Sequence, residues 1–494
     1  MRSWIAVCLP QLPLQALRPR WCEPLAVAIT DASQVIALTP LASLQGVRIG
    51  MRQASALTIA PEVLLVPRAP DREKQTLDAV AMALLQYTPE LALGDEATLL
   101  MDVSASLSAF GGWRRLCRCV RSSVHALGFS VRLGMAPTAQ AAWLFAHHHC
   151  GYRRRAVQMH SMRRLLDSIA FNVLPAAHAH VEWLRELGCR TLADLRRLPR
   201  AGLRRRASKT LMEGLDRAYG EAPELFEWIV APQTFSASLE LPYRIDQATQ
   251  LLLASQRLLL QLTGWLAARQ QAVVAFHLTI AHETEQSRYA KEAKRGPVVV
   301  NITLAEPAWE APHLLRLLKA HLEQLVLPSP AVGLSLTATR LAERAPSSGR
   351  LFPEPGGTPE DYRRLLELLV ARLGPDAVQL PCVRDDHRPE MANQWQRAID
   401  AKGKGHCSAE DGVAERPFWL LEVPLALRMQ GDHPFYGSPL RLMSGPERIE
   451  TGWWDDALVM RDYFVAQGAE GACYWIYREW DADTARWYLH GLFA

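Results

Sequence analysis

The sequence predicts an α+β protein that consists of several domains. Its 494 residues amount to about three ordinary domains, because one domain commonly spans about 150 residues. Hydrophobic residues make up 49% of the chain and charged residues 21%, which supplies enough apolar surface for packed cores and excludes a mostly disordered chain. Strand-like stretches alternate with helix-like stretches through most of the sequence, which is typical of an α+β architecture.

Composition also limits the possible functions. No apolar run approaches the roughly 20 residues of a membrane helix, so we expect a cytoplasmic protein without a membrane partner. The nine cysteines include no C-x-x-C pair, so we expect structural thiols, no metal site and no cofactor. Arginines form short runs, as at 153–155 and 204–206, which suits phosphate backbones, although high-GC coding gives the same bias.

The first two predicted domains cover residues 1–160 and 161–232. In the first, we expect strands at 4–8, 25–30, 34–38, 99–103 and 131–135, and helices at 71–86, at 113–127 and after the cap Thr138. The second is helical from about 162 to 220. It contains a helix-hairpin-helix-like turn at Gly188, where Thr191 and Asp194 predict a capping box on the next helix.

The rest of the chain divides into three further parts. Residues 233–344 show the order strand, helix, strand, strand, helix, strand, which predicts a four-stranded sheet with two helices on one face. Residues 345–415 are expected to be a linker with one helix at 359–373 and a poorly patterned stretch near 383–416. Residues 416–494 are rich in Trp, Tyr and β-branched residues, which predicts a small β-rich interaction domain.

This order of domains resembles the Y-family translesion DNA polymerases, and three short strings agree with it. They are Q-G-V-R-I-G-M at 45–51, L-M-D-V-S at 100–104 and G-M-A-P-T at 134–138. The resemblance implies a palm with inserted fingers for residues 1–160, a thumb for 161–232 and a little finger for 233–344.

The resemblance also places the family's catalytic positions on unsuitable residues. Two-metal nucleotidyl transfer requires carboxylates to hold a pair of divalent ions. The first-strand positions fall on Cys8 and Pro10, the Asp-Glu positions on Ala97 and Thr98, and two phosphate-binding positions on Pro40 and Ser43. We therefore expect no catalytic residue and no enzyme activity.

Asp95, Glu96 and Asp102 leave an alternative open, which is an active translesion polymerase. A two-residue bulge would be needed to bring Asp95 and Glu96 into register, and a shift of two residues moves a side chain about 7 Å along a strand. The other interpretation is that all three are solvated acids at a strand end.

The C-terminal strings narrow the resemblance to the ImuB family, the non-catalytic Y-family homologues of a bacterial SOS mutagenesis cassette. G-P-E-R-I-E-T-G-W-W at 445–454 and W-Y-L-H-G-L-F at 487–493 are long and specific, and residues 8–17 are similar to the family's opening. The resemblance implies a DNA-binding scaffold in damage-induced, error-prone translesion synthesis. Its implied partners are primer–template DNA, an ImuA-like RecA-type protein, an error-prone replicative-type polymerase and the sliding clamp. A structural repair factor that uses the palm only as a fold would differ mainly in its partners.

Two groups of residues are candidates for non-specific DNA binding, and one pair for clamp binding. The thumb candidates are Gly188, Arg190, Thr191, Arg197 and Arg200, where backbone N–H groups and guanidinium groups would meet a phosphate. The little-finger candidates are Lys291, Lys294 and Arg295. A plain helix connection and a solvated loop are the alternatives. Leu351 and Phe352 form a weak clamp-binding motif, because Ser347 and Ser348 stand where the family has a Gln.

Overall fold

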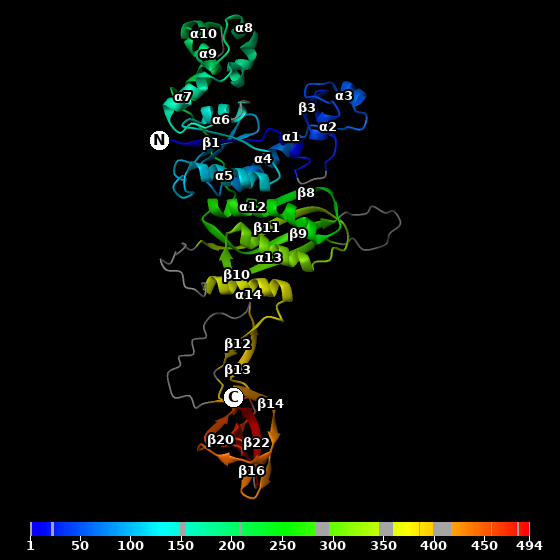
Figure 1. Cartoon of the computed structure of the whole chain (residues 1–494), viewed down its shortest axis with the longest axis vertical. Helices are drawn as coiled ribbons and strands as arrows, with labels where there is room; N and C mark the ends of the chain where they lie inside the picture. The colour runs from blue at the N-terminus through cyan, green and yellow to red at the C-terminus, as the bar shows by residue number, and fades with distance from the viewer. Residues whose placement is uncertain are drawn as a thin grey trace. The chain divides into compact units, whose positions relative to one another are not determined.

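The computed structural model describes ten segments of the chain. They are residues 2–20, 24–148, 155–206, 209–282, 296–344, 359–384, 386–398, 416–455, 457–481 and 484–493. The chain divides into two compact units, 1–368 and 369–494 (Figure 1). No helix within the described segments is long and apolar enough to cross a membrane. The division into five domains that the sequence predicts is finer than these two units and stays a prediction.

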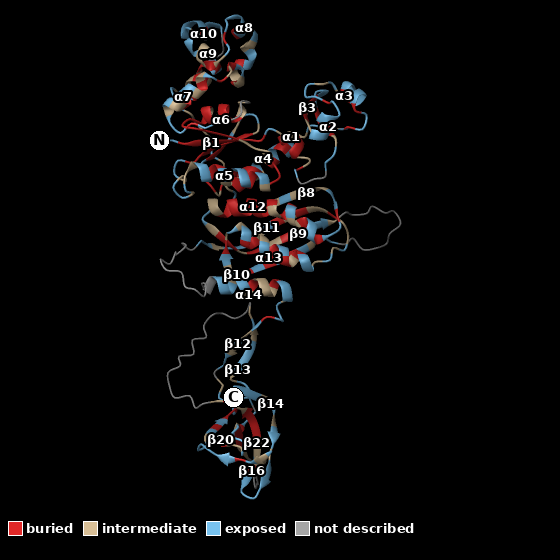
Figure 2. Cartoon of the chain, viewed as in Figure 1, coloured by how far each residue is buried: buried red, intermediate tan, exposed pale blue. Residues whose placement is uncertain are grey.

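A four-stranded antiparallel sheet in the order β5-β6-β1-β7 corresponds to the predicted palm. Its strands are β1 (Trp4–Cys8), β5 (Leu91–Gly94), β6 (Thr98–Asp102) and β7 (Arg132–Ala136). The central strand β1 is completely buried, as the red ribbon in Figure 2 shows. Because successive side chains of a strand point to opposite faces, Trp4, Ala6 and Cys8 pack into one core and Ile5 and Val7 into another.

Three helices cover the two faces of this sheet. α4 (Pro70–Leu84) and α5 (Trp113–Ala126) pack on the face of Ile5 and Val7, and α6 (Ala139–His147) packs on the face of Trp4. The predicted cap is confirmed, because the Thr138 hydroxyl accepts a hydrogen bond from the backbone N–H of Ala141.

A smaller three-stranded sheet is inserted between β1 and β5, where fingers are expected. Its strands in spatial order are β3 (Gln34–Leu38), β2 (Val27–Asp31) and β4 (Leu64–Pro67). The short helices here are α1 (Leu12–Gln15), α2 (Pro40–Leu44) and α3 (Gln53–Ile59). Small separate cores hold this region together.

The predicted thumb is helical, as expected. Its helices are α7 (Met159–Asp167), α8 (Val181–Glu186), α9 (Leu192–Arg197), α10 (Arg200–Arg206) and α11 (Lys209–Tyr219). Their buried side chains form one continuous core with α6 and with the Trp4 face of the palm sheet. The thumb is therefore packed onto the palm.

The predicted little finger has the expected order of elements. They are β8 (Ser236–Ile245), α12 (Leu252–Ala268), β9 (Gln271–His282), β10 (Val298–Ala308), α13 (Ala311–Gln324) and β11 (Ala331–Glu343). The sheet order is β10-β9-β11-β8. α12 packs against α4 through Gly264, where an added Cβ would lie 1.9 Å from the Met82 carbonyl oxygen. Leu260 of α12 also belongs to the core that includes α4 and α5.

The helix expected in the linker, α14 (Pro359–Leu373), begins and ends as predicted, but its N-terminal part packs on the little finger. The Glu367 carboxylate accepts hydrogen bonds from the backbone N–H groups of Ala305 and Glu306 at 2.7 and 3.2 Å. It also lies 3.0 Å from Nε2 of the buried His313. Glu367 thus satisfies donors on the edge strand β10, and part of the expected linker is joined to the little finger.

The second unit is rich in β-strands, as predicted. Its larger sheet has the spatial order β14 (Trp419–Ala426), β22 (Thr484–Leu492), β21 (Cys473–Asp481), β20 (Val459–Gln467) and β18 (Arg441–Leu442). β19 (Glu447–Thr451) also pairs with β20, and β15 (Arg428–Gln430), β16 (His433–Tyr436) and β17 (Ser438–Pro439) form a small sheet. One correction concerns the poorly patterned stretch. Part of it pairs as a hairpin of β12 (Gln379–Val383) with β13 (Asn393–Arg397).

Candidate functional site

Three side chains form a row at the end of the palm sheet, and two of them, Cys8 and Thr98, stand where the Y-family resemblance implies carboxylates. Cys8 on β1 lies opposite Thr98 on β6 and opposite Arg132 on β7. Directly opposite residues in antiparallel strands project to the same face. This is the face that α6 covers, and His147 at the end of α6 meets the row there.

His147 is fixed by three neighbours. Its ring stacks on Trp143 with the ring centroids 3.8 Å apart. Nε2 lies 2.8 Å from the hydroxyl of the fully buried Thr98, and Nδ1 lies 3.3 Å from the Glu96 carboxylate. At one of the two Asp-Glu positions the protein therefore has a hydroxyl paired with an imidazole.

Sequence reasoning missed His147. Its partner Thr98 is 49 residues away in the chain, so no local spacing joins them. The available signal was Thr98 itself, a polar residue at the start of an apolar strand, since a buried hydroxyl requires a partner.

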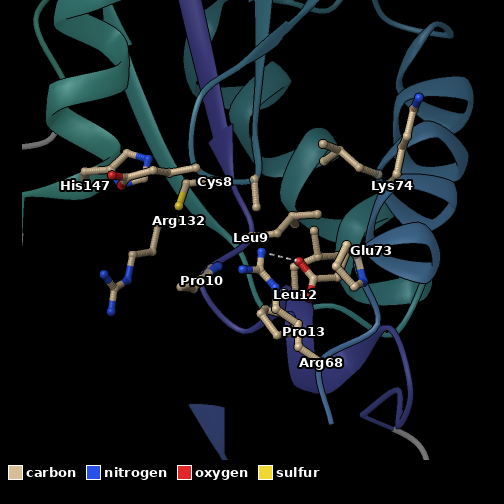
Figure 3. Close-up of a pocket in the computed structure, with 14 residues that line it drawn as sticks. Cys8, Leu9, Pro10, Leu12, Pro13, Arg68, Glu73, Lys74, Arg132 and His147 are labelled. Carbon is tan, nitrogen blue, oxygen red and sulfur yellow. Dashed lines mark hydrogen bonds and ion pairs between the residues drawn. The ribbon is translucent and has the colours of Figure 1, made fainter. Parts of the chain in front are cut away.

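A pocket of about 510 Å³ opens beside this row (Figure 3). Cys8, Pro10 and His147 line one part of it, while Arg68 and Glu73 line another. Nε and Nη2 of Arg68 donate hydrogen bonds to the Glu73 carboxylate at 2.8 and 2.9 Å. The hydrogen bond to Glu73, together with one to Asp31, raises the pKa of Arg68 above its ordinary value. The charge of Arg68 is thus already balanced within the protein.

The three acids of the polymerase alternative do not come together. Asp95 and Glu96 lie in the turn between β5 and β6, and the Asp95 carbonyl accepts a hydrogen bond from Trp143 at 3.1 Å. Asp102 pairs with Trp4 at the far end of β6. Because four residues of strand separate it from Thr98, the intervening distance is about 13 Å.

Asp102 also requires a correction, because it is buried and not solvated as expected. Its Oδ1 accepts hydrogen bonds from the Ser104 backbone N–H at 3.0 Å and from the Ser104 hydroxyl at 2.5 Å. These bonds within the strand end replace its contacts with water. Asp95 and Glu96 are exposed, as expected.

A pair of Mg²⁺ ions, which the Y-family resemblance implies, does not fit these donors. Mg²⁺ is bound in near-octahedral geometry mainly by carboxylate and phosphate oxygens and water. The row supplies the Cys8 thiol and the Thr98 hydroxyl, with Glu96 as the adjacent carboxylate, and Glu73 is held by Arg68. Across the described segments, no group of three or more His, Cys, Asp or Glu side chains is arranged to hold a metal ion.

The two positions at which the Y-family resemblance implies phosphate-binding groups are Pro40 and Ser43. Pro40 and Ser43 lie on the exposed side of α2 and carry no charge.

At the start of α6, the Glu224 carboxylate accepts hydrogen bonds from the N–H groups of Ala139 and Gln140 at 2.9 and 2.7 Å. Since helix N-termini attract anions, Glu224 fills this position from within the chain. Burial raises the pKa of Glu224 despite these bonds.

The thumb turn has the predicted capping box, but its backbone N–H groups are not available for a DNA phosphate as we expected. Gly188 has a positive φ of 80°, and Thr191 caps α9. The Asp194 carboxylate accepts hydrogen bonds from the backbone N–H groups of Arg190 and Thr191 at 3.1 and 3.0 Å, which lowers the pKa of Asp194. These N–H groups were expected to meet a DNA phosphate, and Asp194 already occupies them.

The thumb arginines differ in their surroundings. Arg190 is exposed, and 82% of the Arg197 side chain is exposed, with Nη1 3.9 Å from Asp194. Arg200 pairs with Asp216 at 2.8 Å and Glu221 at 3.0 Å. The remaining candidates lie outside the described residues, namely Lys291, Lys294, Arg295, Leu351 and Phe352.

Comparisons with known proteins agree with the resemblance in the sequence. The model of the impB/mucB/samB family matches residues 14–147. Protein ImuB of Caulobacter vibrioides strain NA1000 / CB15N is 22% identical over 471 residues, which cover 90% of this chain and 99% of that protein. Protein ImuB of strain ATCC 19089 / CIP 103742 / CB 15 matches equally. The predicted resemblance to ImuB is confirmed.

Solved Y-family structures are similar over a smaller part of the chain. An insertion ternary complex of Dbh DNA polymerase has a TM-score of 0.39 and 15% identity, covering 69% of this chain and 99% of that one. DinB from Sulfolobus solfataricus has a TM-score of 0.38 and 15% identity, covering 68% and 98%. With the family match and the observed order of elements, the predicted fold class is confirmed as a Y-family-like α+β chain with a separate β-rich C-terminal region.

Proposed function

We propose that this ImuB homologue is a non-catalytic, DNA-binding scaffold of damage-induced, error-prone translesion synthesis. The observation that carries the proposal is the end of the palm sheet, where Cys8 and Thr98 stand at positions for which the Y-family resemblance implies carboxylates, and where His147 bonds to Thr98. The distance of Asp102 from this end supports the same conclusion. Similarity to ImuB extends over 90% of the chain, so the proposal covers the C-terminal unit as well.

Primer extension tests the loss of catalysis. Purified protein should extend no primer with Mg²⁺ or Mn²⁺, because the donors at this strand end do not fit the ions. It should still bind the same primer–template. Extension that disappears in Asp102→Ala, in a preparation free of other polymerases, would instead establish an active polymerase.

DNA binding by the thumb is proposed to use side chains, because Asp194 occupies the backbone donors. Arg190→Ala with Arg197→Ala should weaken primer–template binding for all sequences and lower the salt slope by about 2, since each duplex phosphate contact contributes about 0.9. Of the remaining candidates, Arg200 in the thumb and Lys291, Lys294 and Arg295 in the little finger are proposed to contribute in the same sequence-independent way. Arg316→Ala with Lys319→Ala on α13 removes two exposed charges and serves as the control. An equal loss in this control would remove the thumb from the proposal.

Scaffolding is proposed to involve the second unit, where large apolar side chains are exposed. Trp453 and Trp454 are 76% and 52% exposed, and their rings pack against each other with centroids 5.4 Å apart. Exposed aromatic residues are frequent energetic centres of protein interfaces. A tagged chain from DNA-damaged cells should retain a RecA-type protein and a replicative-type polymerase. The variant with Trp453→Ala and Trp454→Ala should no longer retain at least one of these two proteins. The Trp395→Ala variant, changed at a residue that is 66% exposed, should retain both.

The clamp contact is proposed to use Leu351 and Phe352. Of the described elements on either side of this pair, β11 is a strand of the little-finger sheet, and α14 packs on the edge strand β10 of the same sheet. Replacing both residues by Ala should weaken clamp binding by about two to four orders of magnitude, because burying each side chain contributes about 1.5–3 kcal/mol. Surface plasmon resonance measures this, with Leu365→Ala, at an exposed position of α14, as the control. Unchanged clamp affinity in the double variant would contradict the assignment.

A further inference from the structure

The outer face of α5 carries a strip of arginines that the proposed function does not use. Arg114, Arg118 and Arg121 are spaced by four and three residues, so they lie along one line of the helix, with Arg115 beside them. All four are exposed, and Figure 2 shows α5 in pale blue beside the buried sheet. From Arg114 to Arg121 this arginine strip extends about 10 Å along the helix axis.

The charge of this arginine strip is not balanced locally. The helix contains no Asp or Glu between Trp113 and Ala126. Within the described segments, none of the four guanidinium groups forms an ion pair with a carboxylate. The thumb differs here, because its Arg196 and Arg200 both bond to Glu221.

The arginines are also not part of the core that holds α5 in place. α5 is fixed by its opposite side, where Leu116, Val120 and Val124 are fully buried in the core of the palm. An exposed face of an ordinary soluble helix carries both signs of charge, which stabilise it as i,i+4 pairs. A face with arginines alone repels itself and destabilises the helix slightly. An acidic or phosphate-bearing partner would remove this repulsion.

An aromatic ring extends the arginine strip at the start of α5. The Arg114 guanidinium lies 5.2 Å from the centre of the Trp113 ring, and that of Arg155 lies 5.8 Å from it. Trp113 is partly exposed. Both guanidinium groups lie over the ring, which also packs against the palm core. A base of single-stranded nucleic acid would stack on Trp113 by displacing one of these guanidinium groups, which would then bind the neighbouring phosphate.

We propose that this face of α5 binds the sugar-phosphate backbone of single-stranded DNA, with an unpaired base against Trp113. A guanidinium group binds a phosphate through two parallel hydrogen bonds. A line of arginines therefore matches the regular phosphates of a nucleic-acid backbone better than it matches the scattered carboxylates of an acidic protein. Bases in a duplex are not available to a ring on a helix surface, which favours a single strand. The surface lies on the palm and is separate from the proposed thumb contact.

Fluorescence anisotropy with labelled oligothymidylate tests the proposal. Arg118→Ala with Arg121→Ala should weaken binding about tenfold at moderate salt and lower the salt slope by about 1.4, because each single-strand phosphate contact contributes about 0.7. Arg118→Lys with Arg121→Lys should keep most of the slope, since the charges remain. Arg316→Ala with Lys319→Ala on α13 makes the same change in net charge and should bind as the parent does. Equal thermal unfolding of all variants shows that folding is unchanged.

The outcomes separate this proposal from the thumb contact. If Arg190→Ala with Arg197→Ala abolishes oligothymidylate binding and the α5 variant binds normally, the α5 proposal is overturned and the thumb proposal stands. If the α5 variant alone loses the single strand and keeps duplex primer–template, the α5 proposal is supported. A variant that keeps oligothymidylate binding but no longer retains a protein partner would show that this surface binds an acidic protein, which also overturns the proposal.

Discussion

Thr98 and His147 show how one buried polar pair changes what a strand end can do. The hydroxyl and the imidazole lie 2.8 Å apart where the Y-family resemblance expects a carboxylate. A carboxylate without a metal ion at this position would carry an unpaired charge, which burial opposes strongly. The neutral hydroxyl of Thr98 avoids that cost, and it is not a carboxylate ligand for Mg²⁺.

A substitution at Thr98 tests how much this pair stabilises the fold. Thr98→Val keeps the shape of the side chain but removes the hydroxyl, and it should lower the free energy of unfolding by about 1–2 kcal/mol, because the partly buried ring nitrogen of His147 loses its partner. Urea denaturation measures the change. His147→Phe in the same background should restore part of the loss, since removing both partners leaves no unpaired group. Additive losses in the double variant would show that the two residues do not act together.

Glu224 gives a prediction about pH. Burial raises the pKa of this carboxyl in the folded protein above the ordinary value of 4.5, so the folded state binds the proton more tightly than the unfolded state does. Its contribution to stability is therefore fully present below about pH 4.5 and is lost as the pH rises through the raised pKa.

Glu224→Gln removes this titration and retains an oxygen to accept the N–H bonds of α6. The stability of the parent relative to this variant should therefore decrease between pH 4.5 and neutrality. Chemical denaturation at several pH values measures the difference. A relative stability that increases over this range would show that the two N–H bonds outweigh burial.

At this scale the sequence predicted residue types better than their surroundings. The absence of acids at Cys8 and Pro10 is visible in the sequence, and so is the capping box of Thr191 and Asp194. The burial of Asp102 is not, because it depends on a neighbouring strand that covers the residue. His147 was missed for the same reason.

At the scale of elements, the contact of α12 with α4 depends on one glycine. An added Cβ at Gly264 would lie 1.9 Å from the Met82 carbonyl oxygen, so only a residue without a side chain allows this approach. We predict that Gly264→Ala lowers the free energy of unfolding by about 1–3 kcal/mol through overpacking. Thermal and urea denaturation measure it.

Gly214 in α11 is the matched control. The nearest atom to its added Cβ would be Leu174 Cδ1 at 3.5 Å, which is an ordinary contact. Since alanine favours helices more than glycine does, Gly214→Ala should leave stability unchanged or raise it by up to about 1 kcal/mol. Equal effects of the two substitutions would mean that α12 does not approach α4 this closely.

The helix α14 gives the second prediction at this scale. Glu367→Ala should leave the N–H groups of Ala305 and Glu306 on β10 without their acceptor. Hydrogen bonds to a charged group contribute about 1.5–3 kcal/mol, so these amides should exchange with solvent at least about tenfold faster. Hydrogen exchange with mass spectrometry measures this. Leu365→Ala changes an exposed residue of the same helix and should leave the rates as in the parent. Unchanged exchange in Glu367→Ala would mean that α14 does not protect β10.

Elements with a regular apolar period were predicted closely, as the bounds of β3 and α14 show. The hairpin of β12 and β13 was not predicted. β13 has the sequence N-Q-W-Q-R and is mostly exposed, so it lacks the alternation of apolar and polar residues that indicates a strand. Such a strand is held mainly by its partner, which local sequence does not reveal.

At the scale of the whole molecule, β1 joins two cores within the first unit. One side of this five-residue strand packs with α6 and the thumb, and the other packs with α4, α5 and Leu260 of the little finger. The order of strands and helices was predictable from the alternation in the sequence. The sharing of cores was not, because neighbouring residues of the same strand belong to different ones.

This arrangement of β1 also governs when the protein can fold during its synthesis. β1 leaves the ribosome before its partner strands, which end at Asp102 and Ala136, and Leu260 completes one of its cores later still. Because the chain is synthesised at about 5–20 residues per second, β1 remains without that last contact for on the order of 10 s or more. During this interval the unpaired apolar strand can aggregate with other chains. We therefore expect chaperones to be the first proteins that bind it in the cell.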